Sequence, residues 1–408
     1  MSSYTSSDFI SSAAPGEDWR EAAKAVLAQL EPAAQERRDF NIGFLYISDL
    51  LVDDASGIVS LFSSVLGIEH WVGTVGVGIC APGKSYIDEP AISAMIGHLN
   101  PDEFKVFQDS QSDPDAGLDE WVKTHDPMLI LTHGNPISEQ DPAAALQELE
   151  GRTGGFLLGG LSSSRTTHIQ FADGLAEGDL SGLALSQSVK IATTLSQGCK
   201  PIGEPHIITR GSEHVIREID GSKASEVFEN DLRAMATEKI GINPDTVIID
   251  EDLLDEENPV PEEFRTLLQG EIHIAFPVSQ SDQQDYLVRN IMGIDPDEGA
   301  MAVSENVVNG ESIVFVHRDE KTVRDDLQQQ LSELRRRVEK DTGEFKPKAG
   351  IYVSCVARGF SQNDGDGVNE MALIQSIIGD IPLTGFYAGG EINNARLYGY
   401  TGILTLFL

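Results

Sequence analysis

A glycine-rich strand end near the C-terminus carries the side chains best suited to hold a small ligand. The segment GFYAGGEI begins at Gly385 and places Phe386, Tyr387 and a carboxylate beside three glycines. Glycine allows a ligand to approach the backbone closely, and aromatic rings can form the wall of a small pocket. A carboxylate accepts hydrogen bonds from an ammonium group. The predicted ligand-binding residues of this segment are Tyr387, Gly389, Gly390 and Glu391.

Two arginines and a cysteine in the same half of the chain extend this predicted pocket. Arg358 and Cys355 lie in SCVARG, and Arg289 lies in YLVRN. A guanidinium group can bind a carboxylate through two parallel hydrogen bonds. An amino acid carries both an ammonium and a carboxylate, so it is the ligand class that these residues suggest. The alternative is an internal pair between an arginine and a glutamate that joins two strands without any ligand.

Two cysteines are candidates for a nucleophile. Cys199 lies in a Gly/Pro loop next to Lys200, and Cys355 lies three residues before Arg358, so each has a cation nearby in the sequence. A neighbouring cation favours the reactive thiolate. The sequence places no histidine beside either cysteine, and a structural cysteine is the default. We therefore predict no enzymatic activity and assign no catalytic residue, and a cysteine-dependent enzyme remains an alternative.

The segment GICAPGKS, residues 78–85, satisfies the complete P-loop pattern and follows an apolar strand. The apolar VIIDE at residues 247–251 could supply the acidic residue that holds magnesium in such a site. A P-loop requires a helix that starts at the lysine, but Pro90 would break that helix in its second turn. The β-rich AISAMI that follows favours a hairpin. We expect no nucleotide site here.

Metal-binding patterns are weak. The nine histidines include no pair at the i, i+4 spacing and no HExxH motif. DGDG at residues 364–367 resembles part of a calcium loop but lacks the remaining spaced oxygen ligands, so a polar turn is expected. We assign no metal and no cofactor.

The composition limits the partners and the compartment. The formal net charge is -37 and the pI is about 4.4, with acidic residues spread along the chain. Such a surface repels nucleic acid and anionic membranes, so we expect neither as a partner. The three cysteines suggest no disulfide framework, and the sequence contains no signal-peptide pattern or membrane-length apolar run. The expected location is the cytoplasm.

The order of predicted elements contains an internal repetition. Strands at 40–48 and 71–79 enclose a helix at 56–66, and a helix at 142–150 lies between strands at 128–132 and 155–161. Three segment pairs share a Gly-spaced strand, a polar loop and a second apolar strand. These pairs are GTVGVGIC with AISAMIGHL, GGFLLGGLSSS with LSGLALSQSVKI, and LTGFYAGGEI with YTGILTLFL. They indicate a βαββ unit used about three times.

The chain divides into three predicted parts. Residues 1–37 form an arm that is flexible to about residue 16 and then helical. The acidic, proline-containing segment 245–263 marks a boundary between a first domain, 38–235, and a second domain, 236–408. The second domain opens with a strand at 272–276, continues as a meander over 286–316 and enters a helix at about 322–341. The expected fold class is α/β (α+β), with mixed or antiparallel sheets covered by helices in repeated βαββ-like units.

Several segments together resemble one family of sensory domains. In the stretch 197–228, turn residues bracket strands at 207–209 and 215–219, then a turn and a helix start follow. This order, with FLLGGLSSS before it, resembles the FIST sensory domain of prokaryotic signal-transduction proteins. YLVRNIMGID, SCVARG and PLTGFYAGGEI are similar to the companion FIST C-terminal domain. The two resemblances cover roughly residues 38 to 408.

The resemblance implies a small-molecule sensor in a signalling pathway, with amino acids or their derivatives as the ligand class. Many relatives are fused to output modules that are not found in this sequence, so the resemblance implies a separate signalling protein as partner, or an output that the sequence does not reveal. Eukaryotic F-box proteins that use FIST domains for protein recognition support an alternative, a protein-interaction scaffold without a small ligand. A single axial histidine for haem stays open and unassigned.

Overall fold

The computed structural model describes residues 8–109, 115–176, 178–240, 271–278, 285–361 and 369–408. The acidic segment 245–263, the VIIDE motif and the DGDG turn lie outside these residues. The chain forms two compact units. Unit 1 comprises residues 1–196 and 327–408, and unit 2 comprises residues 197–326. These units follow spatial contacts, whereas the sequence-based domains follow the order of the chain.

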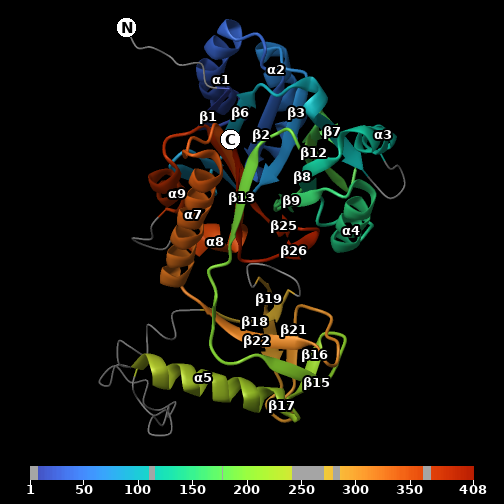
Figure 1. Cartoon of the computed structure of the whole chain (residues 1–408), viewed down its shortest axis with the longest axis vertical. Helices are drawn as coiled ribbons and strands as arrows, with labels where there is room; N and C mark the ends of the chain where they lie inside the picture. The colour runs from blue at the N-terminus through green and yellow to red at the C-terminus, as the bar shows by residue number, and fades with distance from the viewer. Residues whose placement is uncertain (1–7, 110–114, 177, 241–270, 279–284, 362–368) are drawn as a thin grey trace. The chain divides into compact units, whose positions relative to one another are not determined.

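Unit 1 is built from three copies of one supersecondary unit (Figure 1). Each copy consists of a strand, a helix, a second strand, one or more helices, a third strand, a two-stranded hairpin and a last strand. Copy 1 contains β1 (Phe9–Pro15), α1 (Trp19–Glu36), β2 (Ile42–Ser48), α2 (Ala55–Leu66), β3 (His70–Gly76), β4 (Gly78–Ala81), β5 (Lys84–Ile87) and β6 (Ala91–Gly97). Copy 2 contains β7 (Phe104–Asp109), α3 (Ala116–His125), β8 (Pro127–Gly134), α4 (Pro142–Thr153), β9 (Phe156–Leu161), β10 (Gln170–Ala172), β11 (Leu175–Ala176) and β12 (Leu180–Ser186).

Copy 3 is interrupted by unit 2. Its first strand precedes unit 2, its first helix begins in the last residues of unit 2, and its other elements follow unit 2. Copy 3 contains β13 (Ile191–Ser196), α7 (Glu320–Thr342), β23 (Ala349–Cys355), α8 (Val356–Ser361), α9 (Glu370–Ile378), β24 (Leu383–Ala388), β25 (Glu391–Asn393), β26 (Arg396–Tyr398) and β27 (Gly402–Phe407). The predicted threefold repetition is confirmed, and each repeated unit is larger than the predicted βαββ.

The strand pairing is equivalent in the three copies. The second strand pairs in parallel with the third and antiparallel with the last, as β2 does with β3 and β6. In copy 2, β8 pairs in parallel with β9 and antiparallel with β12. In copy 3, β23 pairs in parallel with β24 and antiparallel with β27. The hairpin of each copy joins the sheet of a different copy: β4–β5 joins β24, β10–β11 joins β3, and β25–β26 joins β9. The three copies are therefore interlocked in cyclic order.

One glycine position recurs in all three parallel strand pairs. Gly73, Gly159 and Gly385 lie opposite Leu45, Thr132 and Tyr352, respectively, and have φ angles of 154°, 143° and 158°. A Cβ atom at any of the three would lie 1.8–1.9 Å from the carbonyl oxygen of the opposing residue. Only glycine allows this approach. The glycines that revealed the repetition in the sequence are therefore required by the backbone of each copy.

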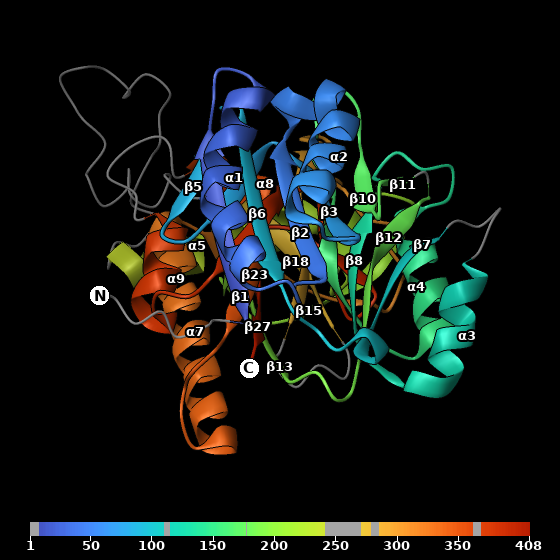
Figure 2. The same cartoon turned by 90° about the horizontal axis from the view of Figure 1, so that it is seen from above.

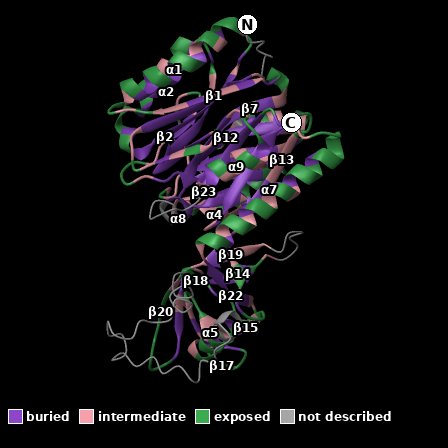
Figure 3. Ribbon diagram, turned by 90° about the vertical axis from the view of Figure 1, so that its left-hand side faces the viewer, coloured by how far each residue is buried: buried purple, intermediate pink, exposed green. Residues whose placement is uncertain are grey.

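Amphipathic helices cover the sheets of unit 1. Helix α1 buries Ala22, Ala23, Val26, Leu27 and Leu30, which lie at helical spacing on one face. It lies beside α2 over the sheet that contains β2 and β6 (Figures 1 and 2). Figure 3 shows buried strands beneath α1 and α7, whose outward sides are exposed. The mixed α/β fold class is confirmed, because the three sheets of unit 1 are mixed and covered by helices.

In its described residues, unit 2 contains a curled antiparallel sheet and helix α5. The predicted strands at 207–209 and 215–219 and the helix that follows them are confirmed. The two ends of this sheet, β19 and β20, are consecutive in the chain and separated by Asn290 alone, so one segment bounds both ends and the sheet curls into a barrel. The described elements are β14 (Lys200–Pro201), β15 (His206–Ser212), β16 (Val215–Ile219), β17 (Ser222–Lys223), α5 (Ala224–Ile240), β18 (Glu271–Pro277), β19 (Tyr286–Arg289), β20 (Ile291–Ile294), β21 (Met301–Val303) and β22 (Ser312–Arg318).

The structure corrects two sequence-based expectations. The flexible arm was expected to extend to about residue 16, but Phe9–Pro15 forms β1 on β6, and the buried Phe9 ring packs against Phe407. The strand expected at 71–79 is divided at Val77, because β3 and β4 belong to different sheets.

The P-loop-like segment is a hairpin, as expected. Ala81 pairs with Lys84 across the turn between β4 and β5. The ammonium group of Lys84 lies 4.2 Å from the centre of the Tyr86 ring, and a strand occupies the place of the helix that would cradle phosphate. The pattern match is therefore fortuitous.

Candidate functional site

The candidate site lies at the carboxyl end of the parallel pair β23–β24. Cys355 is the last residue of β23, and Glu391 begins β25 shortly after β24 ends. Carboxyl ends of parallel strands meet at one edge of a sheet, where side chains from separate segments converge. Thr401 precedes β27 and joins the two: its carbonyl oxygen accepts the Cys355 amide at 2.9 Å, and its own amide and hydroxyl donate to Glu391. Three chain segments thus meet at one point.

Glu391 is a fully buried carboxyl group with one unpartnered oxygen. Its Oε2 accepts hydrogen bonds from the Thr401 amide at 3.0 Å and the Thr401 hydroxyl at 2.8 Å, whereas Oε1 has no hydrogen-bond partner. Burial raises the pKa of Glu391 to about 7, although Thr401, the positive charge of Arg358 and the Cys355 thiol act in the opposite direction. The Cys355 thiol is thus close enough to Glu391 to affect its carboxyl group. Glu391 can gain or lose its proton near neutral pH.

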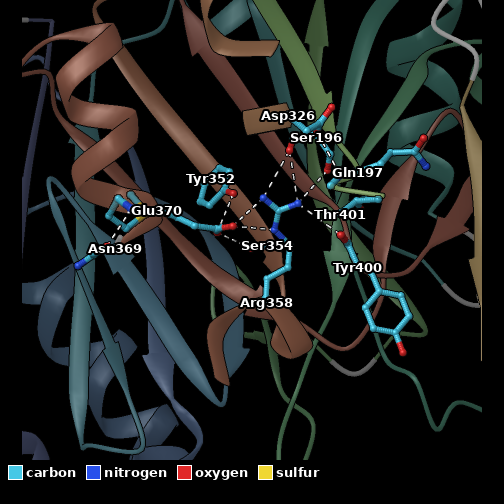
Figure 4. A network of polar contacts seen from close by, with 12 residues as sticks. Ser196, Gln197, Asp326, Tyr352, Ser354, Arg358, Asn369, Glu370, Tyr400 and Thr401 are labelled. Carbon is cyan, nitrogen blue, oxygen red and sulfur yellow. Dashed lines mark hydrogen bonds and ion pairs between the residues drawn. The ribbon is translucent and has the colours of Figure 1, made fainter. Parts of the chain in front are cut away.

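Arg358 is also fully buried, and its ion-pair partner is Glu370 at the start of α9 (Figure 4). Its Nε and Nη2 atoms lie 2.7 and 2.6 Å from Glu370 Oε1. Glu370 Oε2 accepts hydrogen bonds from the hydroxyls of Tyr352 and Ser354 at 3.0 and 3.1 Å. The Nη1 atom of Arg358 donates to the carbonyl oxygen of Ser196 at 3.1 Å. This network ties β13, β23, α8 and α9 together next to Glu391.

The structure brings together three of the seven residues predicted to bind a ligand, namely Cys355, Arg358 and Glu391. The ring of Tyr387 instead lies in the hydrophobic core with residues of α7 and α9. The amide of Gly389 donates to Leu161 in copy 2, and the carbonyl of Gly390 accepts the Leu161 amide, so these groups connect two sheets.

Arg289 lies in unit 2 on β19, where its Nε is 2.7 Å from Glu305 Oε2. It therefore belongs to a different part of the chain from the other predicted residues.

Sequence reasoning missed Thr401 and Glu370. Thr401 has no distinctive motif, and only the register of β27 against β23 brings it to Cys355 and Glu391. Glu370 follows Asn369, whose side chain caps α9. The helix start at this capping residue was the only feature of the sequence that could have pointed to Glu370.

Comparison with known families identifies the chain. Residues 41–222 match the FIST N domain and residues 250–394 match the FIST C domain. The chain belongs to the FIST family. FIST domains are proposed sensory and signalling domains. The candidate site, residues 354–401, lies in the FIST C domain and the few residues after it.

Two relatives are similar to this chain over nearly their whole length. An uncharacterized protein of Mycobacterium tuberculosis is 28% identical over 405 residues, which cover 93% of this chain and 96% of the relative. An uncharacterized protein of Mycobacterium bovis is 28% identical over 418 residues, covering 93% and 95%.

The described part of this FIST chain contains no cluster of three or more histidine, cysteine or acidic residues arranged to hold a metal ion. Among the same residues, no helix is both long and apolar enough to cross a membrane.

The raised pKa of Glu391 predicts that the free energy of unfolding of this chain depends on pH. The folded chain keeps this proton between about pH 4.5 and pH 7, whereas an unfolded chain releases it, so the stability that Glu391 contributes is present at low pH and lost as the pH rises through 7. The loss should be roughly 3 kcal/mol. Urea unfolding from pH 4.5 to 8 would measure it, with Glu391→Gln as the non-titrating reference. Parallel curves for the two proteins would contradict the prediction.

Proposed function

We propose that this chain is a small-ligand-binding sensory protein of a signal-transduction pathway, and that its ligand is an amino acid or another small amine. The unpartnered Oε1 of the buried Glu391 carries this proposal. An ammonium group would donate to this oxygen and stabilise the ionised carboxylate in a site largely removed from water. The half-buried Cys355 marks the side of the site that solvent reaches.

The proposal gives Arg358 a supporting role in place of the predicted role in carboxylate binding. Its guanidinium group is held by Glu370, and the pair is hydrogen-bonded on several sides. The pair fixes β23 and α9 and places a positive charge near Glu391. Recognition through Glu391 alone favours amines as a class, so the amino acid carboxylate is the less important half of the ligand. The proposed role is binding without catalysis.

A ligand screen by thermal unfolding tests this function. An amine at about 100 times its dissociation constant should add about 2.7 kcal/mol of stability to the wild-type protein. Binding should tighten as the pH rises through 7, because the ammonium group pairs with the ionised form of Glu391. Glu391→Gln should abolish the shift.

Glu305→Gln, which removes a carboxylate from unit 2, is the matched control and should keep the shift. A ligand-induced shift that persists in Glu391→Gln would overturn the proposed site. Failure of every amine to stabilise the wild-type protein would overturn the amine class.

We also propose that a separate signalling protein receives the output in a groove between α1 and α2. The groove has a volume of about 490 Å³, and the buried indole Nε1 of Trp19 beside it has no hydrogen-bond partner. The cations Arg20 and Lys24 line this groove together with apolar side chains, which fits a partner that presents an amphipathic helix with acidic residues. The groove is lined by Trp19, Arg20, Lys24, Leu27, Ala28, Glu31, Leu61 and Val65.

A photo-crosslinking residue in place of Leu61 tests this partner. It should capture an acidic helical segment in cells, and Lys24→Glu should reduce the capture at least tenfold through charge repulsion. The control Lys340→Glu changes an exposed lysine in the last turn of α7 and should leave the capture unchanged. Equal capture by both variants would contradict the proposed interface.

A further inference from the structure

The arrangement around Cys355 has the features of a reactive thiol site. Cys355 and Glu391 are both hydrogen-bonded to Thr401, which fixes one relative to the other. Cys355 is half-buried, whereas Cys80 is fully buried in the core of the same unit, so a reagent can reach Cys355 and not Cys80. The sequence offered no histidine as a proton acceptor for this thiol. The structure supplies a carboxyl group in its place.

The unpartnered oxygen of Glu391 is the second observation that points to chemistry at this site. A buried oxygen without a hydrogen-bond partner is costly, and such groups in native proteins commonly serve a ligand or a reaction. Here it belongs to the carboxyl group of Glu391, which the Cys355 thiol is close enough to affect. The thiolate form of cysteine is the nucleophile, so a nearby proton acceptor is what the thiol requires. The guanidinium of Arg358 adds positive charge to the same surroundings.

We propose that Cys355 captures electrophilic small molecules of the α,β-unsaturated carbonyl class, with Glu391 as the proton carrier. The thiol proton passes to Glu391, and the sulfur forms a bond to the β-carbon of the electrophile. The electron pair of the carbon–carbon double bond moves toward the carbonyl group, and Glu391 returns the proton to the α-carbon. The product is a thioether in which S–H has added across the double bond. The step consumes no oxidant, reductant or cofactor.

This inference extends the sensory role to a second class of signal at the same site, and it does not require an amine to bind. If an amine does occupy Glu391, it removes the proton acceptor and should protect Cys355 from modification. The two proposals can therefore fail separately. Adduct formation without any amine-induced thermal shift would leave the electrophile proposal standing, and the reverse pattern would leave only the amine proposal.

Acrylamide, a small member of this class, tests the inference on the full-length chain. We expect intact-mass spectrometry to show one rapid addition, which peptide mapping assigns to Cys355 and which Cys355→Ser abolishes. Glu391→Gln should slow the addition at least tenfold, whereas Glu305→Gln should not change it. Thermal unfolding of each variant checks that it is folded.

If Glu391→Gln fails to fold, the pH dependence of the rate of acrylamide addition to the wild-type protein still tests the inference. A thiol activated by Glu391 should react with a rate that rises through about pH 7, whereas an unassisted thiol follows a midpoint near pH 8.5. A Cys355 rate equal to that of a free cysteine peptide, or a midpoint near pH 8.5, would overturn the inference. An unchanged rate in folded Glu391→Gln would also overturn it.

Discussion

Replacing Gly159 with alanine should prevent unit 1 from folding stably. The new Cβ would lie 1.9 Å from the carbonyl oxygen of Thr132, well inside contact distance, and the φ angle of 143° is one that alanine rarely adopts. The Cβ is fixed to the β9 backbone and the oxygen belongs to the β8 backbone, in the centre of a parallel strand pair, so neither can move without breaking the ladder. The loss should exceed about 4 kcal/mol, in the exceptional range for a single substitution. Soluble yield and urea unfolding would measure it.

The matched control is Gly151→Ala in helix α4 of the same copy. Nothing lies within 4 Å of a Cβ at Gly151, and this residue lies within the helix. Alanine is favoured over glycine in a helix by roughly 0.8 to 1 kcal/mol, so this variant should be slightly more stable than the wild-type protein. The same chemical change thus has opposite signs at two sites eight residues apart. A Gly159→Ala protein as stable as the wild type would refute the proposed backbone requirement.

Replacing Arg358 with methionine should be the second most damaging change. Arg358 is fully buried, and its removal leaves Glu370 as a buried carboxylate without its cation. Breaking a buried ion pair by removing one partner costs about 3 to 5 kcal/mol. Equilibrium unfolding of Lys123→Met is the control, because the pair between Lys123 and Glu120 is exposed and its loss should cause no measurable change.

The double variant Arg358→Met, Glu370→Gln separates charge from packing. If the cost of Arg358→Met arises mainly from the stranded carboxylate, removing that charge as well should recover a substantial part of the lost stability. Equal losses in the single and double variants would show that the guanidinium acts through its other hydrogen bonds, such as the one to Ser196.

The glycine spacing made the threefold repetition visible in the sequence, because each parallel pair needs a residue without a Cβ at one position. The helical spacing of apolar residues in α1 and α7 also identifies the buried face of each helix. The exchange of hairpins among copies could not be predicted. β4 pairs with β24, which is about three hundred residues distant in the chain, and nothing local to either strand specifies that partner.

The candidate site was predicted only in part for a related reason. The Gly-rich strand ends directed attention to Cys355, Arg358 and Glu391, which the structure brings together, because strand ends are where side chains from separate segments meet. The sequence could not show that Arg358 pairs with Glu370 rather than with Glu391 or a ligand, since that choice depends on where α9 begins. The ring of Tyr387 was expected to form a pocket wall, but it lies in the hydrophobic core, because strand alternation turns it toward the helices covering the sheet.

The exchange of hairpins also determines when each strand can pair with its partner during synthesis on the ribosome. The sheet that contains β4 and β5 also contains β13, β23, β24 and β27. The hairpin β4–β5 is therefore synthesised long before its partner β24. Similarly, β13 cannot pair with β27 until residues 402–407 have emerged from the ribosome. During translation these unpaired strand edges are open to association with other chains. Pairing within this sheet is therefore completed only after its last strand has been made.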